Sequence, residues 1–114
     1  MELSEIQRMH EDFVRERKWD RFPASLVFIH LEEEVAEMGS HILIEEGYKK
    51  EGMGNSIHKK DIESECAQVL SLLLQLASAF GVDMEKAFLR ELEKNRKRFP
   101  AEEWRDYMEE KKET

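Results

Sequence analysis

The chain has 114 residues and a mass of 13.6 kDa, the size of one folded domain. Hydrophobic residues make up 40% of it and charged residues 39%, so it keeps enough apolar side chains for a core and is not disordered throughout. Its net charge of −8 opposes contact with a phosphate backbone, which excludes nucleic acid as an expected partner. Two prolines and five glycines are too few for the turns of a sandwich or barrel. The sequence predicts a single all-α domain over residues 1–114.

The cysteine count, the N-terminal residues and the apolar runs bear on location. Cys66 stands alone and cannot form an internal disulfide, and residues 1–5 are acidic with no apolar signal core. The longest apolar run, residues 69–80, contains polar residues and falls short of the roughly 20 residues needed to span a bilayer. We therefore expect a cytoplasmic protein with no membrane partner.

Helix signals at the start of the chain predict two helices. Ser4 and Gln7 form a capping-box pattern that opens a first helix over residues 5–18. A second helix is expected from Pro23, which suits a first helical turn, to about Gly47, which suits the position just past a helix end. This second helix has the clearest periodicity in the chain.

The rest of the chain predicts a loop and three further helices. Residues 48–60 are rich in glycine and polar residues and form a candidate functional loop. A third helix is expected over residues 60–80, and Asp83 is a good N-cap for a fourth helix with a basic end. Residues 101–112 predict a short polar fifth helix. A four-to-five-helix bundle follows.

Apolar residues on the second and third helices repeat in alternating steps of four and three, which predicts core-facing stripes. The second helix carries Ala24, Phe28, Leu31, Val35, Met38 and Ile42, and the third carries Ile62, Cys66, Val69, Leu73, Leu76 and Phe80. Leu70, Leu74 and Ala77 give the third helix a second apolar face. Because one thin layer of helices cannot cover both faces, we expect at least a dimer.

Polar stripes precede these apolar stripes by one residue. They comprise His30, Glu34, Glu37 and His41 on the second helix, and Asp61, Glu65 and Gln68 on the third. If the helices pack through their apolar stripes, the acids meet at one edge, where Mg²⁺ would relieve their mutual repulsion. The alternative is a solvated acidic face, since glutamate is a strong helix former. The two histidines are typical of hydrogen-bonded packing residues.

Three other features of the sequence bear on function. Lys94, Asn95 and Arg98 suit phosphate binding, or their cations simply complement the dipole at a helix end. Trp19 lies in the turn between the first two helices, where an aromatic ring stacks on a base or covers a core edge. Cys66 has no nearby base and is not expected to be a nucleophile.

Three motifs resemble those of the MazG-like all-alpha nucleoside triphosphate pyrophosphohydrolases. Residues 30–38 resemble the EExxE motif, with Glu33, Glu34 and Glu37 in its acidic positions. Residues 65–70 look like the family's ExxD motif, and residues 93–99 are similar to its KNxxR segment. The motifs stand in the family's order, which is more specific than any single acidic pair.

The resemblance implies an oligomeric helical bundle, a dimer or tetramer, that uses Mg²⁺ to cleave nucleoside triphosphates between the α and β phosphates. It implies Glu34, Glu37, Glu65 and Gln68 as metal ligands, Glu33 as the residue that orients water, and Lys94, Asn95, Arg98, Trp19 and His30 as substrate contacts. Gln68 departs from the family, which has aspartate there, and this loss of one negative charge should weaken cation binding. A non-catalytic nucleotide-binding or metal-binding relative and a helical oligomerisation module are therefore the alternatives.

Overall fold

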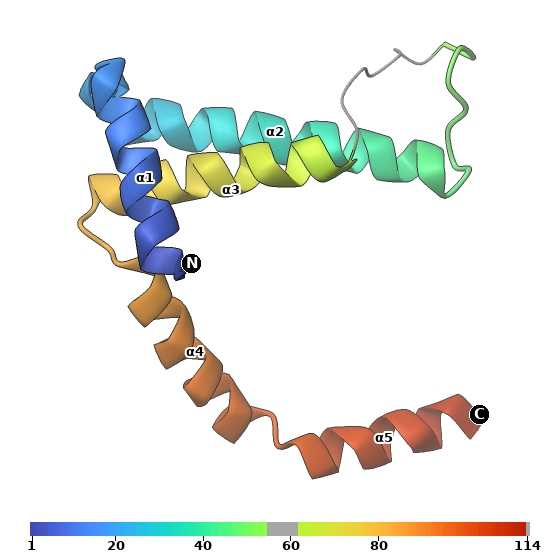
Figure 1. The fold of residues 1–114 in the computed structure, drawn as a ribbon. Helices are drawn as coiled ribbons and strands as arrows, with labels where there is room; N and C mark the ends of the chain where they lie inside the picture. Colours follow the sequence, from blue (N-terminus) through green and yellow to red (C-terminus); the bar gives the residue numbers. More distant parts are fainter. Residues whose placement is uncertain (55–61, 114) are drawn as a thin grey trace.

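A computed structural model describes residues 1–54 and 62–113, which form helices joined by turns (Figure 1). The elements are α1 (Leu3–Glu16), a 3₁₀ turn η1 (Trp19–Arg21), α2 (Ala24–Glu45), α3 (Ile62–Ala79), α4 (Met84–Arg98) and α5 (Ala101–Glu113). The predicted all-α class is confirmed. The part of the predicted loop that the structure describes ends at residue 54; the rest of the loop and Asp61 lie outside the described residues.

An antiparallel pair, α2 and α3, forms the centre of the molecule, and α1 crosses one end of it (Figure 1). Gly47 ends α2 with a φ of +80°, a conformation that glycine adopts without steric cost, as the sequence predicts. The buried apolar side chains among the described residues come from α1, α2 and α3. They are Val14, Val27, Leu72, Leu74 and Ala77.

The predicted capping box at Ser4 and Gln7 is wrong. In the structure α1 begins at Leu3, so Glu2 is the N-cap residue. The Glu2 side chain makes no capping hydrogen bond within the described part of the chain. Ser4 lies within the first turn and donates its hydroxyl hydrogen to Asp83 Oδ1 at 3.0 Å. A partner distant in sequence has replaced the local one.

Gln7 is buried and joins α1 to the turn between α3 and α4. Its Nε2 donates to Ser78 Oγ at 3.1 Å and to the Val82 carbonyl at 2.8 Å, while its Oε1 accepts from the Met84 backbone N–H at 2.9 Å. Every polar atom of this amide therefore has a partner, which a side chain 5% exposed requires. These bonds hold the turn from which α4 leaves the helix pair.

Asp83 caps α4 as the sequence predicts. Its carboxylate accepts hydrogen bonds from the Lys86 backbone N–H at 3.2 Å and from the Ser4 hydroxyl. The bond from Lys86, with a smaller contribution from Ser4, lowers the pKa of Asp83 below its ordinary value of 3.8. The folded chain therefore favours the ionised carboxyl.

We expect this cap to make stability depend on pH in acid. A lowered pKa contributes stability that is complete above the unfolded value of 3.8 and is lost as the pH falls through the folded value. Asp83→Asn keeps a capping oxygen but does not titrate, so its free energy of unfolding should fall less than the parent's between about pH 5 and pH 3. Urea denaturation over that range measures this, with Asp106→Asn on α5 as the control. Equal pH dependence of parent and Asp83→Asn would contradict the expectation.

The two C-terminal helices make the chain extended. From the end of the helix pair α4 leads away, and α5 then runs back at a distance from α2 and α3 (Figure 1). The radius of gyration is 18.6 Å, against roughly 13 Å for a compact domain of this length. The helix count is as predicted, but α4 and α5 form an arm in place of a closed bundle within one chain.

The apolar stripe predicted on α2 is covered only in part, since Ala24, Leu31 and Met38 are half-buried. Val27 and Glu34 are the buried residues of α2, whereas Phe28, Val35 and Ile42 are 50%, 46% and 43% exposed. Since the residues on both faces of α2 repeat at helical spacing, periodicity alone could not show which face α3 covers. Phe28, Val35 and Ile42 therefore form an exposed stripe on α2 in the single chain.

The stripe predicted on α3 is also wrong in part. Cys66, Leu73 and Phe80 are exposed, while Glu65 and Leu72 are buried. The Cys66 thiol lies 3.6 Å from the Met38 sulfur at the surface and not in a core.

Within the described residues, no single helix is long and apolar enough to cross a membrane. Only α3 and α4 taken together, across a bend of 99°, have the required length and composition.

Candidate metal centre and adjoining cavity

Three glutamates from α2 and α3 meet at the middle of the helix pair. Glu34 and Glu37 lie one turn apart on α2, and Glu65 lies in the first turn of α3. One carboxylate oxygen from each residue lies within 4.8 Å of the others, and we call these three residues the carboxylate group. The structure thus brings together the acids that the spacing predicted to converge.

Burial sets this carboxylate group apart from a solvated acidic face. Glu65 is 1% exposed and Glu34 is 7% exposed, while Glu37 is half-buried. Glu65 Oε2 is buried and accepts no hydrogen bond from the residues that the structure describes. Leaving a buried acceptor unpaired costs about 1–3 kcal/mol, and more when the group is charged. A cation among the three carboxylates would remove this cost.

Histidines flank the carboxylate group at both ends. His30 Nε2 lies 3.4 Å from Glu34 Oε1, one turn away on the same helix. His41 Nε2 lies 3.7 Å from Glu65 Oε1, across the contact between α2 and α3. Each histidine thus lies beside one glutamate of the carboxylate group.

The donor set suits a hard divalent cation. Mg²⁺ takes oxygen ligands at about 2.0–2.1 Å, which places opposite ligands about 4 Å apart. Oxygens within 4.8 Å of one another reach that arrangement through small side-chain rotations. The three glutamates therefore fit Mg²⁺ or a similar ion.

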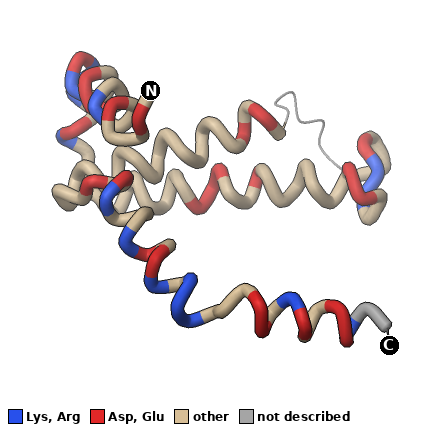
Figure 2. Tube along the Cα trace, turned by 60° about the horizontal axis from the view of Figure 1, so that its bottom comes forward, with Lys and Arg blue, Asp and Glu red and all other residues tan. Residues whose placement is uncertain are grey.

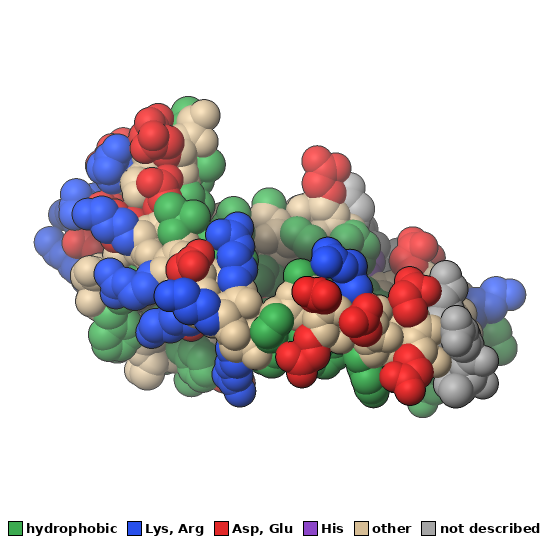
Figure 3. All heavy atoms as spheres, turned by 90° about the horizontal axis from the view of Figure 1, so that it is seen from below, with side chains coloured by type: hydrophobic (Ala, Val, Ile, Leu, Met, Phe, Trp, Pro, Cys, Tyr) green, Lys and Arg blue, Asp and Glu red, His purple; other side chains and the backbone are tan. Residues whose placement is uncertain are grey.

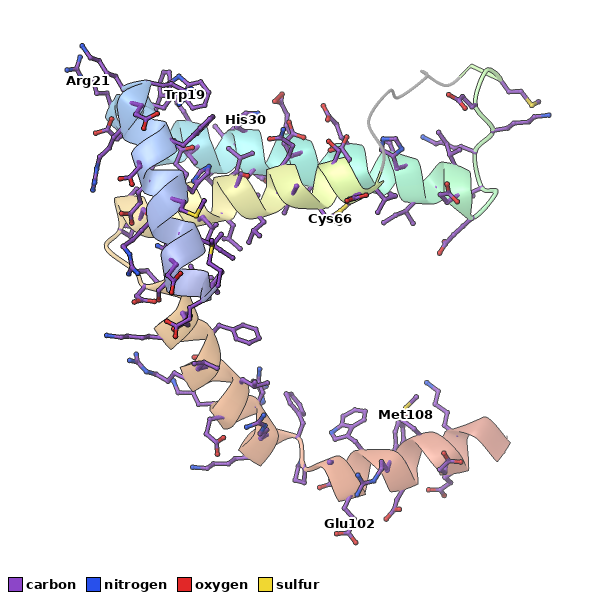
Figure 4. The ribbon with its side chains drawn as sticks, viewed as in Figure 1. Trp19, Arg21, His30, Cys66, Glu102 and Met108 are labelled. Atoms are coloured by element: carbon purple, nitrogen blue, oxygen red, sulfur yellow. The ribbon has the colours of Figure 1, made fainter. Side chains whose placement is uncertain are left out.

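A cavity of about 800 Å³, which we call the aromatic cavity, is linked to the carboxylate group through its lining residue His30, whose Nε2 lies 3.4 Å from Glu34. Its lining comes from α1, η1, α2 and α3. It comprises His10, Phe13, Trp19, Phe22, Leu26, Val27, His30, Gln68, Ser71, Leu72 and Gln75. Figure 4 shows Trp19 near the start of α2 and His30 further along that helix, so the cavity lining extends from η1 along α2.

Trp19 and His30, both predicted to contact substrate, line this aromatic cavity. The Trp19 ring packs edge-on against Phe13, with the ring centres 5.6 Å apart. His10 stacks on the same Phe13 ring. Burial lowers the pKa of His10 below its ordinary 6.5. The cavity wall is therefore aromatic and uncharged on the α1 side.

Sequence reasoning missed His10 and Phe13 as cavity residues. The sequence shows that His10 and Phe13 are three residues apart, a spacing that places both rings on one face of α1. The position of α1 across α2 and α3 was not visible, because distant contacts such as those of Gln7 determine it.

Two further predicted site residues are neighbours of the carboxylate group along their helices. Gln68 follows Glu65 by one turn, and its side chain lines the aromatic cavity. Glu33 is exposed on α2 next to Glu34.

The basic segment of α4 does not meet the carboxylate group within one chain. Lys94 Nζ lies 3.4 Å from Glu91 on the same helix, and the Arg98 guanidinium lies over the Phe99 ring at 5.1 Å. Figure 2 shows acidic residues on the middle of α2, while the basic residues of α4 follow the arm away from it. The expectation that Lys94, Asn95 and Arg98 share a site with the three glutamates is therefore not met in a single copy.

No family model matches the chain. It is similar to dCTP pyrophosphatase 1 from Homo sapiens, Rattus norvegicus and Bos taurus, with 31%, 30% and 29% identity over 102, 103 and 104 residues. These alignments cover 87%, 86% and 86% of this chain. The chain spans 59% of the length of each of these curated relatives.

Proposed function

We propose that this chain is a nucleoside triphosphate pyrophosphohydrolase of the MazG-like all-alpha family that depends on a divalent metal. The observation that carries the proposal is the buried carboxylate group beside an aromatic cavity. Both lie on the helices that carry the EExxE and ExxD-like motifs. Similarity to dCTP pyrophosphatase 1 supports the same class of activity.

Glu34, Glu37 and Glu65 are the residues that would hold Mg²⁺, with the Gln68 amide oxygen as a weaker fourth ligand. A bound ion supplies positive charge that neutralises the triphosphate and makes water more acidic. The burial of Glu65 holds its carboxylate in place, so little side-chain freedom is lost on binding.

The aromatic cavity would receive the nucleoside. Its volume of about 800 Å³ lies in the range of small-molecule sites, and its lining combines aromatic rings with a few polar groups. The Trp19 and Phe22 rings would stack on the base, while His30 lies nearer the phosphates because it pairs with Glu34.

Glu33 would orient the attacking water and accept its proton. The side chain is exposed next to Glu34, so water reaches it without displacing packed residues. Attack by this water breaks the bond between the α and β phosphates and gives a nucleoside monophosphate and pyrophosphate. This role requires a carboxylate that lies close to Glu34, Glu37 and Glu65 but does not itself hold the metal.

Self-association is part of the proposal. The chain exposes 9379 Å² of surface, about 2,800 Å² more than a compact monomer of this mass, while a standard interface buries about 800 Å² per partner. Hydrophobic side chains reach the surface between charged ones on the face seen in Figure 3. We propose that the arm formed by α4 and α5 of one copy covers the exposed stripe on α2 of another copy. This contact would bring Lys94, Asn95 and Arg98 to the phosphates of the nucleotide that the other copy binds.

Pyrophosphate release from a panel of ribonucleoside and deoxyribonucleoside triphosphates tests the activity. With Mg²⁺ we expect equal amounts of pyrophosphate and monophosphate from at least one nucleotide, and loss of both products in chelator. Thermal stabilisation by Mg²⁺ and nucleotide without products would indicate a non-catalytic binding protein. If the chain gives no products and is not stabilised by Mg²⁺ and nucleotide, the result would indicate an oligomerisation module.

A further inference from the structure

Gln68 stands where the carboxylate group gives way to the aromatic cavity. It follows Glu65 by one turn on α3, and its side chain lines the cavity. Gln68 is exposed, so its amide is accessible to a ligand, and it makes no hydrogen bond with any residue in the described part of the chain. Ser71 donates to the Ala67 carbonyl at 2.9 Å, and Gln75 Nε2 donates to the Trp19 carbonyl at 3.5 Å.

The position of Gln68 along α3 indicates which part of a nucleotide it would meet. A helix rises 1.5 Å per residue, so Gln68 lies about 4.5 Å along the axis from Glu65, and Gln75 lies about 15 Å from it. In a nucleotide whose phosphates lie at the carboxylate group, the pentose comes first and the base comes second. Gln68 is therefore level with the pentose, and the aromatic rings are level with the base.

The chemistry of the amide differs from that of the aspartate which the family resemblance expects at this position. An ionised carboxylate only accepts hydrogen bonds, whereas a glutamine amide has two N–H donors and one acceptor oxygen. An amide oxygen directed toward a metal ion still leaves the Nε2 donors for a ligand in the cavity. A hydroxyl group is a good partner because it both donates and accepts.

We propose that the Gln68 amide binds a hydroxyl group of the pentose, and that this chain thereby selects nucleotides whose sugar ring carries free hydroxyls. The inference rests on the proposed nucleotide site and deepens it. A neutral hydrogen bond of this kind changes affinity by about 5- to 10-fold.

Binding of two nucleoside monophosphates tests this proposal without turnover, because neither contains the bond that would be cleaved. Trp104→Phe leaves Trp19 as the one tryptophan, and its fluorescence reports on the cavity. CMP and 2′,3′-dideoxy-CMP, which share the base and phosphate and differ only in ring hydroxyls, are titrated in Mg²⁺. We expect CMP to bind this variant about 5- to 10-fold more tightly than dideoxy-CMP.

Substitutions of Gln68 in the same background assign the preference. Gln68→Leu should bind CMP and dideoxy-CMP equally. Its affinity for both should match the affinity for dideoxy-CMP of the Trp104→Phe variant that retains Gln68. Gln68→Asp should bind Mg²⁺ more tightly than the parent, because a carboxylate attracts the ion more strongly than an amide oxygen. Glu63→Gln, exposed on α3 and outside the cavity lining, is the control and should keep the preference. Circular dichroism checks that each variant retains its helix content.

Equal binding of CMP and dideoxy-CMP to the Gln68 chain would overturn the inference and leave the proposed function standing. A preference that survives in Gln68→Leu would overturn it in the same way. If neither nucleotide changes Trp19 fluorescence or releases heat on calorimetric titration, the inference and the proposed nucleotide site are both wrong.

Discussion

Replacing Glu65 by glutamine is expected to abolish Mg²⁺ binding and to lower any pyrophosphohydrolase activity at least about 100-fold. The carboxylate group has only three charges, and Glu65 is the most buried of its members at 1% exposure. Loss of one carboxylate removes a third of the charge that attracts the ion. Calorimetric titration with MgCl₂ and pyrophosphate release measure the two effects.

The same substitution should stabilise the protein in chelator. Two like charges about 5 Å apart repel each other by about 1 kcal/mol even in water. Removing the carboxylate of Glu65 therefore removes its repulsion with Glu34 and with Glu37.

Glu63→Gln provides the matched control for Glu65→Gln. Glu63 is exposed on the same helix, two residues earlier, and is not a member of the carboxylate group. It should change neither Mg²⁺ binding nor thermal stability in chelator. Undiminished Mg²⁺ binding by Glu65→Gln would show that the ion, if any, binds elsewhere.

Val35→Lys should convert the assembled protein to monomers. Val35 lies midway along the exposed stripe of α2, between Phe28 and Ile42, and is 46% exposed in the single chain. A lysine in the centre of an apolar interface would have to bury its charge without a partner, which costs several kcal/mol. We expect the parent to sediment as a dimer or larger species at micromolar concentration and the variant as a monomer of lower thermal stability.

Ser25→Lys is the control for added charge. Ser25 is exposed on the same helix and outside the apolar stripe, so the variant should sediment like the parent. A parent chain that sediments as a monomer would contradict self-association, and the exposed stripe would then need another explanation.

Local signals in the sequence were sufficient for the helices and for the three converging glutamates. Asp83 and Gly47 mark helix ends through short-range chemistry that any chain shares. The spacing of Glu34 and Glu37 places both on one face of α2 whatever the rest of the fold does. Their meeting with Glu65 needed only that α2 and α3 pack as neighbours.

Contacts between distant residues were not predictable in this way. Val27 and Val35 lie on neighbouring stripes of α2, and the choice between them depends on how α3 approaches. The direction of α4 depends on Gln7, whose partners lie more than 70 residues away in sequence. The sequence therefore predicted the basic segment of α4 but not its separation from the carboxylate group.

The long-range bonds of α1 also have a consequence for the order in which the chain folds. Gln7 and Ser4 bind partners between Ser78 and Glu85, so the N-terminal helix has no polar partners there until most of the chain has left the ribosome. Contacts between distant residues form late, because closing a long loop costs entropy before any contact compensates it. The hairpin of α2 and α3 would therefore form first during synthesis, and α1 would dock last, completing the wall of the aromatic cavity.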